Sequence, residues 1–88
     1  MSEFYRFPAI KGLEEFDNSD QLEKIYSEVE ESREAYFGAP NDVAFGIELM
    51  DVIHAAETAL RMNFTDEDVE SMHQLTISKN KKRDYYND

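Results

Sequence analysis

The sequence predicts an all-α protein, an antiparallel helical bundle whose small core is completed by dimerisation. Apolar residues recur at helical spacing, only two prolines and three glycines occur, and no segment alternates apolar and polar residues for long enough to form a strand. A chain of 88 residues forms one domain, 1–88, and buries only about 64% of its unfolded surface. We therefore expect help from a partner subunit or a bound ion.

An aromatic N-terminal arm, residues 1–18, precedes a helical core over residues 19–86. Pro8 and Gly12 break regular structure in the arm. A free tail has no use for large apolar side chains, so we expect the arm to pack on the helical core or on a partner subunit. The side chains concerned are Phe4, Tyr5, Phe7, Ile10, Leu13 and Phe16.

The first helix is expected to begin near Ser19 or Asp20, either of which can cap it, and to end at the Gly-Ala-Pro sequence of residues 38–40. The second helix is expected over residues 41–63, with an apolar sector wide enough to pack on two neighbours. On its opposite side, Glu57 and Arg61 are four residues apart and form a modest helix pair. The apolar sector consists of Ala44, Phe45, Leu49, Val52, Ile53, Ala56, Ala59 and Leu60.

The third helix is expected over residues 66–83, with Thr65 as its N-cap and an acidic first turn that suits the helix dipole. The residues expected to point inward are Val69, Met72, Thr76 and Ile77. Short turns between the helices favour antiparallel neighbours.

Charge is distributed unevenly along the chain. Residues 1–78 hold 18 acids and 5 bases, a net charge of −13, and residues 79–88 hold 4 bases and 2 acids, a net charge of +2. An acidic body argues against nucleic acid or an anionic membrane surface as a partner. The absence of cysteine excludes disulfides and thiolate metal sites. With neither an apolar run of about 20 residues nor a signal peptide, the expected location is cytoplasmic.

Glu48 is the most informative residue, because helical spacing places it beside apolar neighbours, where a lone carboxylate is costly. Asp51 lies one turn further on, and Glu28 and Glu31 repeat the three-residue spacing on the first helix. If the two helices are antiparallel neighbours, these four carboxylates can converge in one cleft. Such a cleft suits Mg²⁺, with Mn²⁺ as a possible substitute. Glu34 offers a second frame with Glu31.

Two plainer interpretations remain open. Acids three or four residues apart are common on solvated helix faces, and this explanation suits Glu28 with Glu31. Glu48 can instead form a buried ion pair with Arg33 or Lys24.

A basic segment ends the third helix. Lys79 and Arg83 are four residues apart and share a face, and Asn80 adds an amide, so the three can bind phosphate. The alternative is that these bases only complement the helix dipole. A polyphosphate site needs both acids that hold a metal ion and bases that hold the phosphates. His54 and His73 lack further ligands at zinc spacing and are interpreted as ordinary polar or interface residues.

The spacing E28-V-E-E31, then sixteen residues, then E48-L-M-D51, with the ending K-N-K-K-R-D-Y-Y, resembles the MazG-like nucleoside triphosphate pyrophosphohydrolases. The resemblance covers residues 20–86. It implies an all-α bundle that forms a homodimer or a dimer of dimers. It also implies hydrolysis of an NTP or dNTP between the α- and β-phosphates, giving NMP and pyrophosphate. The chain departs from the family where Ser27 replaces a frequent glutamate.

The resemblance assigns roles to the candidate residues. Glu28, Glu31, Glu48 and Asp51 match the catalytic metal-ligand positions, and Lys79 and Arg83 match the phosphate-contacting positions.

The leading hypothesis is therefore an enzyme, a Mg²⁺-dependent nucleotide pyrophosphohydrolase. The alternative is a non-catalytic, acidic helical protein that binds a basic partner.

Overall fold

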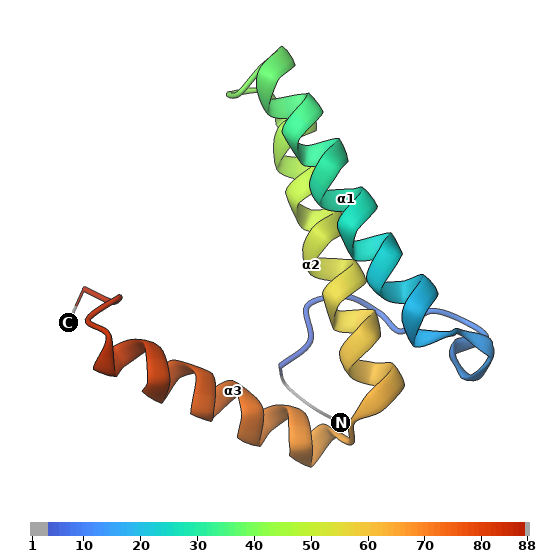
Figure 1. Ribbon diagram of the computed structural model, residues 1–88, viewed down its shortest axis with the longest axis vertical. Coiled ribbons are helices and arrows are strands. Elements are labelled where there is room, and N and C mark those ends of the chain that lie inside the picture. The colour runs from blue at the N-terminus through green and yellow to red at the C-terminus, as the bar shows by residue number, and fades with distance from the viewer. Residues whose placement is uncertain (1–3, 88) are drawn as a thin grey trace.

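The structure, a computed structural model, describes residues 4–87 and confirms the all-α fold class (Figure 1). A short 3-10 turn, η1 (Leu13–Glu15), precedes three helices, α1 (Asn18–Gly38), α2 (Val43–Asn63) and α3 (Asp66–Lys82). No strand occurs in residues 4–87, and none of the helices there has the length and apolar character needed to cross a bilayer. Residues 1–3 of the expected arm lie outside the described residues.

The helix ends follow the capping chemistry of the sequence. Thr65 caps α3 as predicted, and Asp68 completes a capping box by accepting the backbone N–H of Thr65. The predicted caps of α1 are wrong, because the side chain of Asp17 accepts the backbone N–H of Ser19 and the helix begins one residue earlier. These caps place the helix boundaries within about two residues of those expected.

Helices α1 and α2 pack side by side as an antiparallel hairpin (Figure 1). The α1 side chains at their interface recur at alternating spacings of four and three residues, the spacing of a coiled-coil seam. These are Gln21, Ile25, Glu28 and Ser32, of which all but Ile25 are buried. The hairpin fixes which side chains of α1 and α2 face one another.

Polar side chains dominate the buried positions. Among the described residues, the only buried hydrophobic side chains are those of Ala55 and Val69. The buried hydroxyls bond back within their own helices, which satisfies them at no cost to the seam. The buried polar residues are Gln21, Glu28, Ser32, Glu57 and Thr58. Such a seam contributes little hydrophobic stabilisation, which indicates that its polar residues have a role besides packing.

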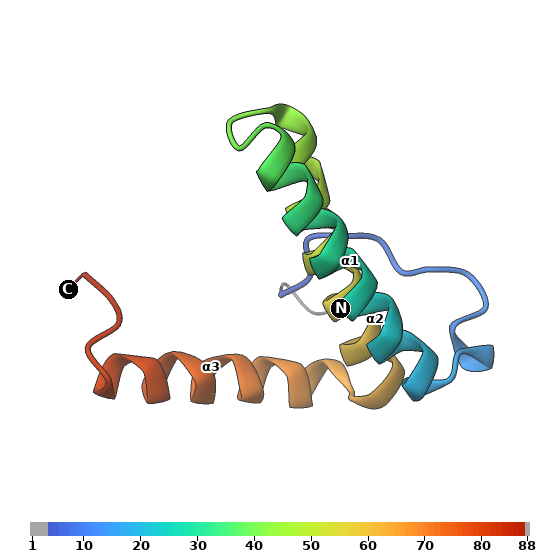
Figure 2. The ribbon, with the colours of Figure 1, turned by 45° about the horizontal axis from the view of Figure 1, so that its top comes forward.

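Helix α3 leaves the hairpin and runs away from it (Figures 1 and 2). Val69, near its start, is 2% exposed, whereas Leu75 is 66% exposed. The expected inward face is therefore wrong beyond the first turns, since Thr76 and Ile77 are exposed and Met72 is half-buried. The chain by itself does not close into a three-helix bundle.

The dimensions agree with this open shape. The accessible surface is 7069 Å², against about 5,400 Å² for a compact protein of this mass. The radius of gyration is 14.9 Å, against about 12 Å for a compact domain of this length. Exposed large apolar side chains of the hairpin and of α3 contribute to this surface.

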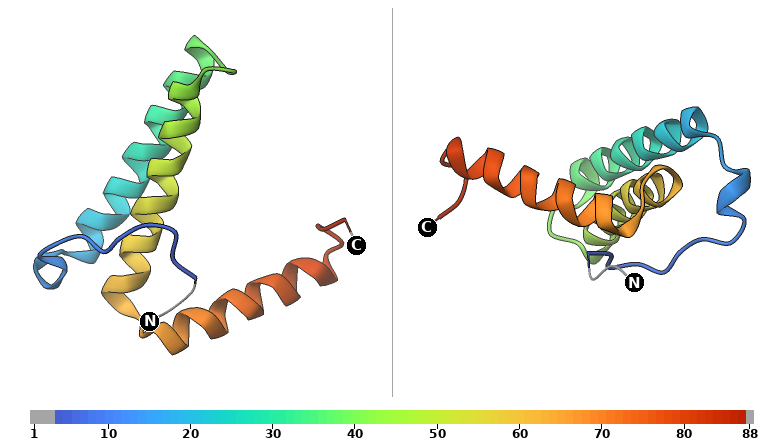
Figure 3. Two further views of the ribbon diagram at one scale, coloured as in Figure 1. Left: turned by 180° about the vertical axis from the view of Figure 1, so that it is seen from behind. Right: turned by 90° about the horizontal axis from the view of Figure 1, so that it is seen from below.

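The N-terminal arm crosses α2 and is fastened there (Figure 3). The Glu57 carboxylate, 3% exposed, accepts the backbone N–H groups of Arg6 and Phe7 at 3.0 Å. Arg61 donates to the carbonyl of Phe7 at 2.8 Å and lies 3.9 Å from the Tyr5 ring centroid. The expectation that Glu57 and Arg61 form a surface pair opposite the packed face is therefore wrong. They bind the arm to α2.

Tyr5 contributes to the stability of the protein through its ring and not through its hydroxyl. Its hydroxyl is buried and has no hydrogen-bond partner among residues 4–87. We expect Tyr5→Phe to leave the free energy of unfolding unchanged near neutral pH or to raise it by up to about 1 kcal/mol. Burial raises the pKa of the Tyr5 phenol above 10.0, against an opposing effect of Arg61. The unfolded chain therefore ionises first as the pH rises through 10.

Wild-type stability thus falls above that pH, and the Tyr5→Phe variant lacks this loss. Urea unfolding of both proteins at neutral and alkaline pH measures the difference. A variant that is clearly less stable at neutral pH would show that the hydroxyl has a partner.

Candidate metal centre

Three carboxylates from two helices meet on the hairpin. Glu28 comes from α1, and Glu48 and Asp51 come from α2. One oxygen of each lies within 4.8 Å of the other two. Glu28 is only 6% exposed, while the group as a whole remains open to solvent. The structure thus brings together three of the four carboxylates that the sequence singled out.

Helical periodicity explains which acids meet. Glu28 belongs to the α1 seam, which continues at Ser32, four residues on. Glu31 stands beside this four-residue step, so it faces solvent and lies outside the group. Glu34 is exposed as well. Of the two overlapping frames on this helix, the one that reaches α2 begins at Glu28.

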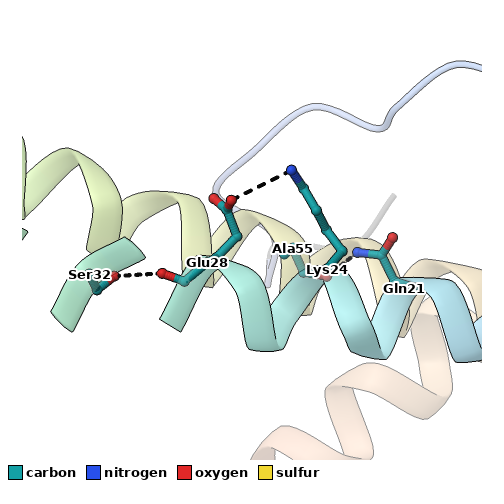
Figure 4. Close-up of polar contacts among 5 residues, drawn as sticks. All are labelled: Gln21, Lys24, Glu28, Ser32 and Ala55. Atoms are coloured by element: carbon teal, nitrogen blue, oxygen red, sulfur yellow. Dashed lines mark hydrogen bonds and ion pairs between the residues drawn. The ribbon is translucent and has the colours of Figure 1, made fainter. Parts of the chain in front are cut away.

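Lys24 and Arg33, the expected ion-pair partners of Glu48, contact other residues. The Lys24 ammonium lies 3.5 Å from Glu28, one helical turn away, and the Lys24 side chain is 61% exposed (Figure 4). Lys24 therefore pairs with Glu28 and not with Glu48. Arg33 lies over the ring of Phe37, 5.8 Å from its centroid. A single mobile ammonium offsets only part of the charge of three carboxylates.

A cavity of about 650 Å³ opens beside the carboxylates. Glu28 and Asp51 line one part of it, and Ile10 and Phe16 of the arm line another. The arm therefore builds a wall of the site, because Glu57 and Arg61 hold it against α2. The volume of the cavity falls within the range of roughly 300–1,000 Å³ usual for small-molecule pockets.

Gln21 and His54 are among the cavity residues for which no site role was expected. Gln21 is 6% exposed and lines the cavity. It lies seven residues before Glu28, so the two residues occupy equivalent positions of the seam. This spacing was the signal in the sequence that could have identified Gln21. His54 also lines the cavity, and its ring stacks on Phe7 at a centroid distance of 4.8 Å. A histidine paired with an arm residue leaves no pattern in the sequence.

The basic segment lies elsewhere in the chain. Lys79 and Asn80 belong to the end of α3, and Arg83 is its C-cap. This end of α3 points away from the hairpin in every view (Figures 1 to 3). Arg83 contacts Tyr85, with its guanidinium carbon 5.9 Å from the ring centroid. Acids and bases of the expected polyphosphate site are thus separated within one chain.

Comparison with known proteins adds no assignment. No protein-family model, curated protein or solved structure matches the chain.

Proposed function

We propose that this protein is a Mg²⁺-dependent nucleotide pyrophosphohydrolase of the MazG-like kind. The observation that carries the proposal is the meeting of Glu28, Glu48 and Asp51, with their oxygens within 4.8 Å of one another. Like charges this close repel each other in a structural seam. A seam built for stability alone has no need of them, whereas a metal site requires them.

The chemistry of the donors fits Mg²⁺. All three are carboxylates, the ligands that this ion prefers, and Mn²⁺ accepts the same set. Ligand oxygens of an octahedral Mg²⁺ lie about 3.0 Å apart when adjacent and about 4.2 Å apart when opposite. The limit of 4.8 Å on the separations of the three carboxylate oxygens is close to the larger of these distances. Water and substrate phosphate would fill the remaining positions.

The reaction is the attack of water on the α-phosphorus, with cleavage of the bond to the β-phosphate oxygen and departure of pyrophosphate. Bound Mg²⁺ supplies charge stabilisation for the phosphate and makes the attacking water easier to deprotonate. Glu31, exposed and one turn from Glu28, would be the residue that accepts the proton of that water. Lys24 already lies at the site and can turn from Glu28 to the phosphates once the metal neutralises that carboxylate.

A second copy of the chain would supply what one copy lacks. The α3 helix is largely unpacked, and its exposed Leu75 precedes the basic segment by one turn. If α3 of each copy lies on the hairpin of the other, Lys79, Asn80 and Arg83 reach the partner's carboxylates. The excess accessible surface described above would be buried in the same step.

Pyrophosphate release tests the proposal. A panel of NTPs and dNTPs is incubated with the protein in Mg²⁺ and in EDTA. We expect release from at least one nucleotide in Mg²⁺ only. No release from any of them, together with salt-sensitive binding to a basic protein, would support the alternative of a non-catalytic acidic interaction protein.

Mixing two inactive variants tests the shared site. Glu48→Gln removes a metal ligand and Arg83→Ala removes a phosphate contact. In a twofold dimer with sites built across the interface, each mixed dimer keeps one intact site, so random mixing restores roughly a quarter of the activity. Sites contained within single chains would stay inactive on mixing.

Oligomeric state gives a separate prediction. We expect the wild-type protein to have a solution mass of at least twice 10.3 kDa, measured by light scattering. Leu75→Glu places a charge in the apolar contact and should give monomers. Gln74→Glu is the matched control, because the neighbouring residue is exposed and receives the same charge. Equal masses for the two variants would place the interface elsewhere.

A further inference from the structure

The Gln21 side chain has a fixed orientation at the cavity. Its Nε2 donates to the backbone carbonyl of Ala55 at 2.8 Å. A carbonyl oxygen only accepts, so the amide cannot be reversed, and its Oε1 is turned away from α2. Figure 4 shows the amide on the side of α1 that also carries Lys24 and the Glu28 carboxylate.

The Oε1 atom of Gln21 can accept a hydrogen bond from a ligand. Gln21 is 6% exposed and lines the cavity, and within residues 4–87 its Oε1 receives no hydrogen bond. This oxygen is not one of the buried polar side-chain atoms that lack a partner, so water reaches it, and a ligand that supplies an N–H takes the place of that water. Asp17 and Asp20 lie on the same cavity and also favour donors over acceptors.

Apolar side chains form part of the cavity wall, beside acidic and polar residues. Ile10 and Phe16 of the arm and Ala55 of α2 line it. Phe16 is 39% exposed and Ile10 is 38% exposed, so both retain open surface for a ligand. A heterocyclic ring that carries N–H donors on its edge matches apolar walls with acceptors between them.

We propose that this cavity binds the base of the nucleotide and selects bases with an exocyclic amino group, with Gln21 as the residue that determines specificity. The inference rests on the proposed function, since it assumes that the ligand at the carboxylates is a nucleotide. Gln21 Oε1 accepts the amino group of cytosine or adenine. Uracil and hypoxanthine present a carbonyl oxygen at the same position and bring two acceptors together.

The experiment uses nucleosides and the full chain in EDTA, so it involves neither metal nor turnover. Nuclear magnetic resonance titrations compare cytidine with uridine and adenosine with inosine, two pairs that differ by an amino group against an oxygen. We expect about tenfold tighter binding of the amino member in each pair. The side-chain amide signal of Gln21 should shift with cytidine and adenosine.

Variants assign the preference to one residue. Gln21→Met keeps the length of the side chain and removes the acceptor, so each pair should then bind within about twofold. Gln74→Met on the exposed face of α3 is the control and should keep the wild-type preference. The comparison in the wild-type protein stands even if Gln21→Met does not fold.

Each outcome decides the inference separately from the enzymatic function. Equal affinity within both pairs, a preference that survives in Gln21→Met, or no nucleoside binding up to the solubility limit overturns it. A preference without pyrophosphate release supports the base site and contradicts the hydrolase. Pyrophosphate release without a preference does the reverse.

Discussion

Replacing Glu48 with glutamine is expected to abolish Mg²⁺-dependent pyrophosphate release while leaving the helices intact. The substitution keeps the size of the side chain and removes one of three negative ligands. Loss of a metal ligand should lower activity by about a hundredfold or more. The affinity for Mg²⁺ or Mn²⁺, measured by calorimetry in the absence of nucleotide, should fall with it.

Without metal, Glu48→Gln should be at least as stable as the wild type. Oxygens that lie within 4.8 Å of one another repel, and the substitution relieves part of this repulsion. In EDTA we expect Glu48→Gln to unfold at the same temperature as the wild type or slightly above it. In Mg²⁺ the order should reverse, because at a hundred times its dissociation constant a ligand stabilises the native state by about 2.7 kcal/mol.

Glu30→Gln is the matched control for this experiment. Glu30 is exposed on α1, outside the carboxylate group, and loses the same charge. It should keep both activity and metal affinity. Glu31→Gln separates two roles, since a residue that only accepts a proton from water affects turnover and leaves metal binding unchanged. Full activity in Glu48→Gln would contradict the metal centre.

Much of the hairpin, and most of the carboxylate group, follows from local rules. Capping residues and helical spacing locate α2 and α3 to within about two residues. Glu28, Glu48 and Asp51 meet because an antiparallel pair aligns the residues of each seam. Glu31 was expected with them and faces solvent, because the seam passes from Glu28 to Ser32 in a four-residue step that leaves Glu31 beside it. Periodicity locates a face, and only the register of the two helices decides which acids touch.

The parts that the sequence did not predict depend on contacts far apart in the chain. Glu57 has the spacing of a surface helix pair with Arg61, yet its partners are backbone N–H groups about fifty residues away. Backbone groups are the same at every residue, so no pattern announces such a contact. The direction of α3 is hidden for a related reason, because short turns predict antiparallel neighbours and α3 has few apolar residues with which to form them.

Releasing the arm is the second large effect that we expect. Glu57→Ala removes the acceptor of two backbone N–H groups at once, and each unmet group costs about 1–3 kcal/mol. Part of this cost is recovered when the arm detaches into water. We expect a net loss of about 2–4 kcal/mol in the free energy of unfolding. A chain of this length has a total of only about 4–13 kcal/mol.

Glu30→Ala is the control, since the same substitution at an exposed position of α1 should change stability by less than about 0.5 kcal/mol. Limited trypsin digestion reports on the arm directly, because Arg6 and Lys11 both lie in it. Cleavage at these two sites should accelerate in Glu57→Ala and not in Glu30→Ala.

The arm variant also links the fold to the site. Ile10 and Phe16 line the cavity only while the arm is held against α2, so its release removes a wall. The carboxylates belong to the hairpin and keep their positions. We therefore expect Glu57→Ala to bind Mg²⁺ like the wild type under conditions in which it remains folded, yet to bind nucleosides more weakly. Loss of metal affinity in the folded variant would contradict this division, because it would make the arm a support of the metal centre.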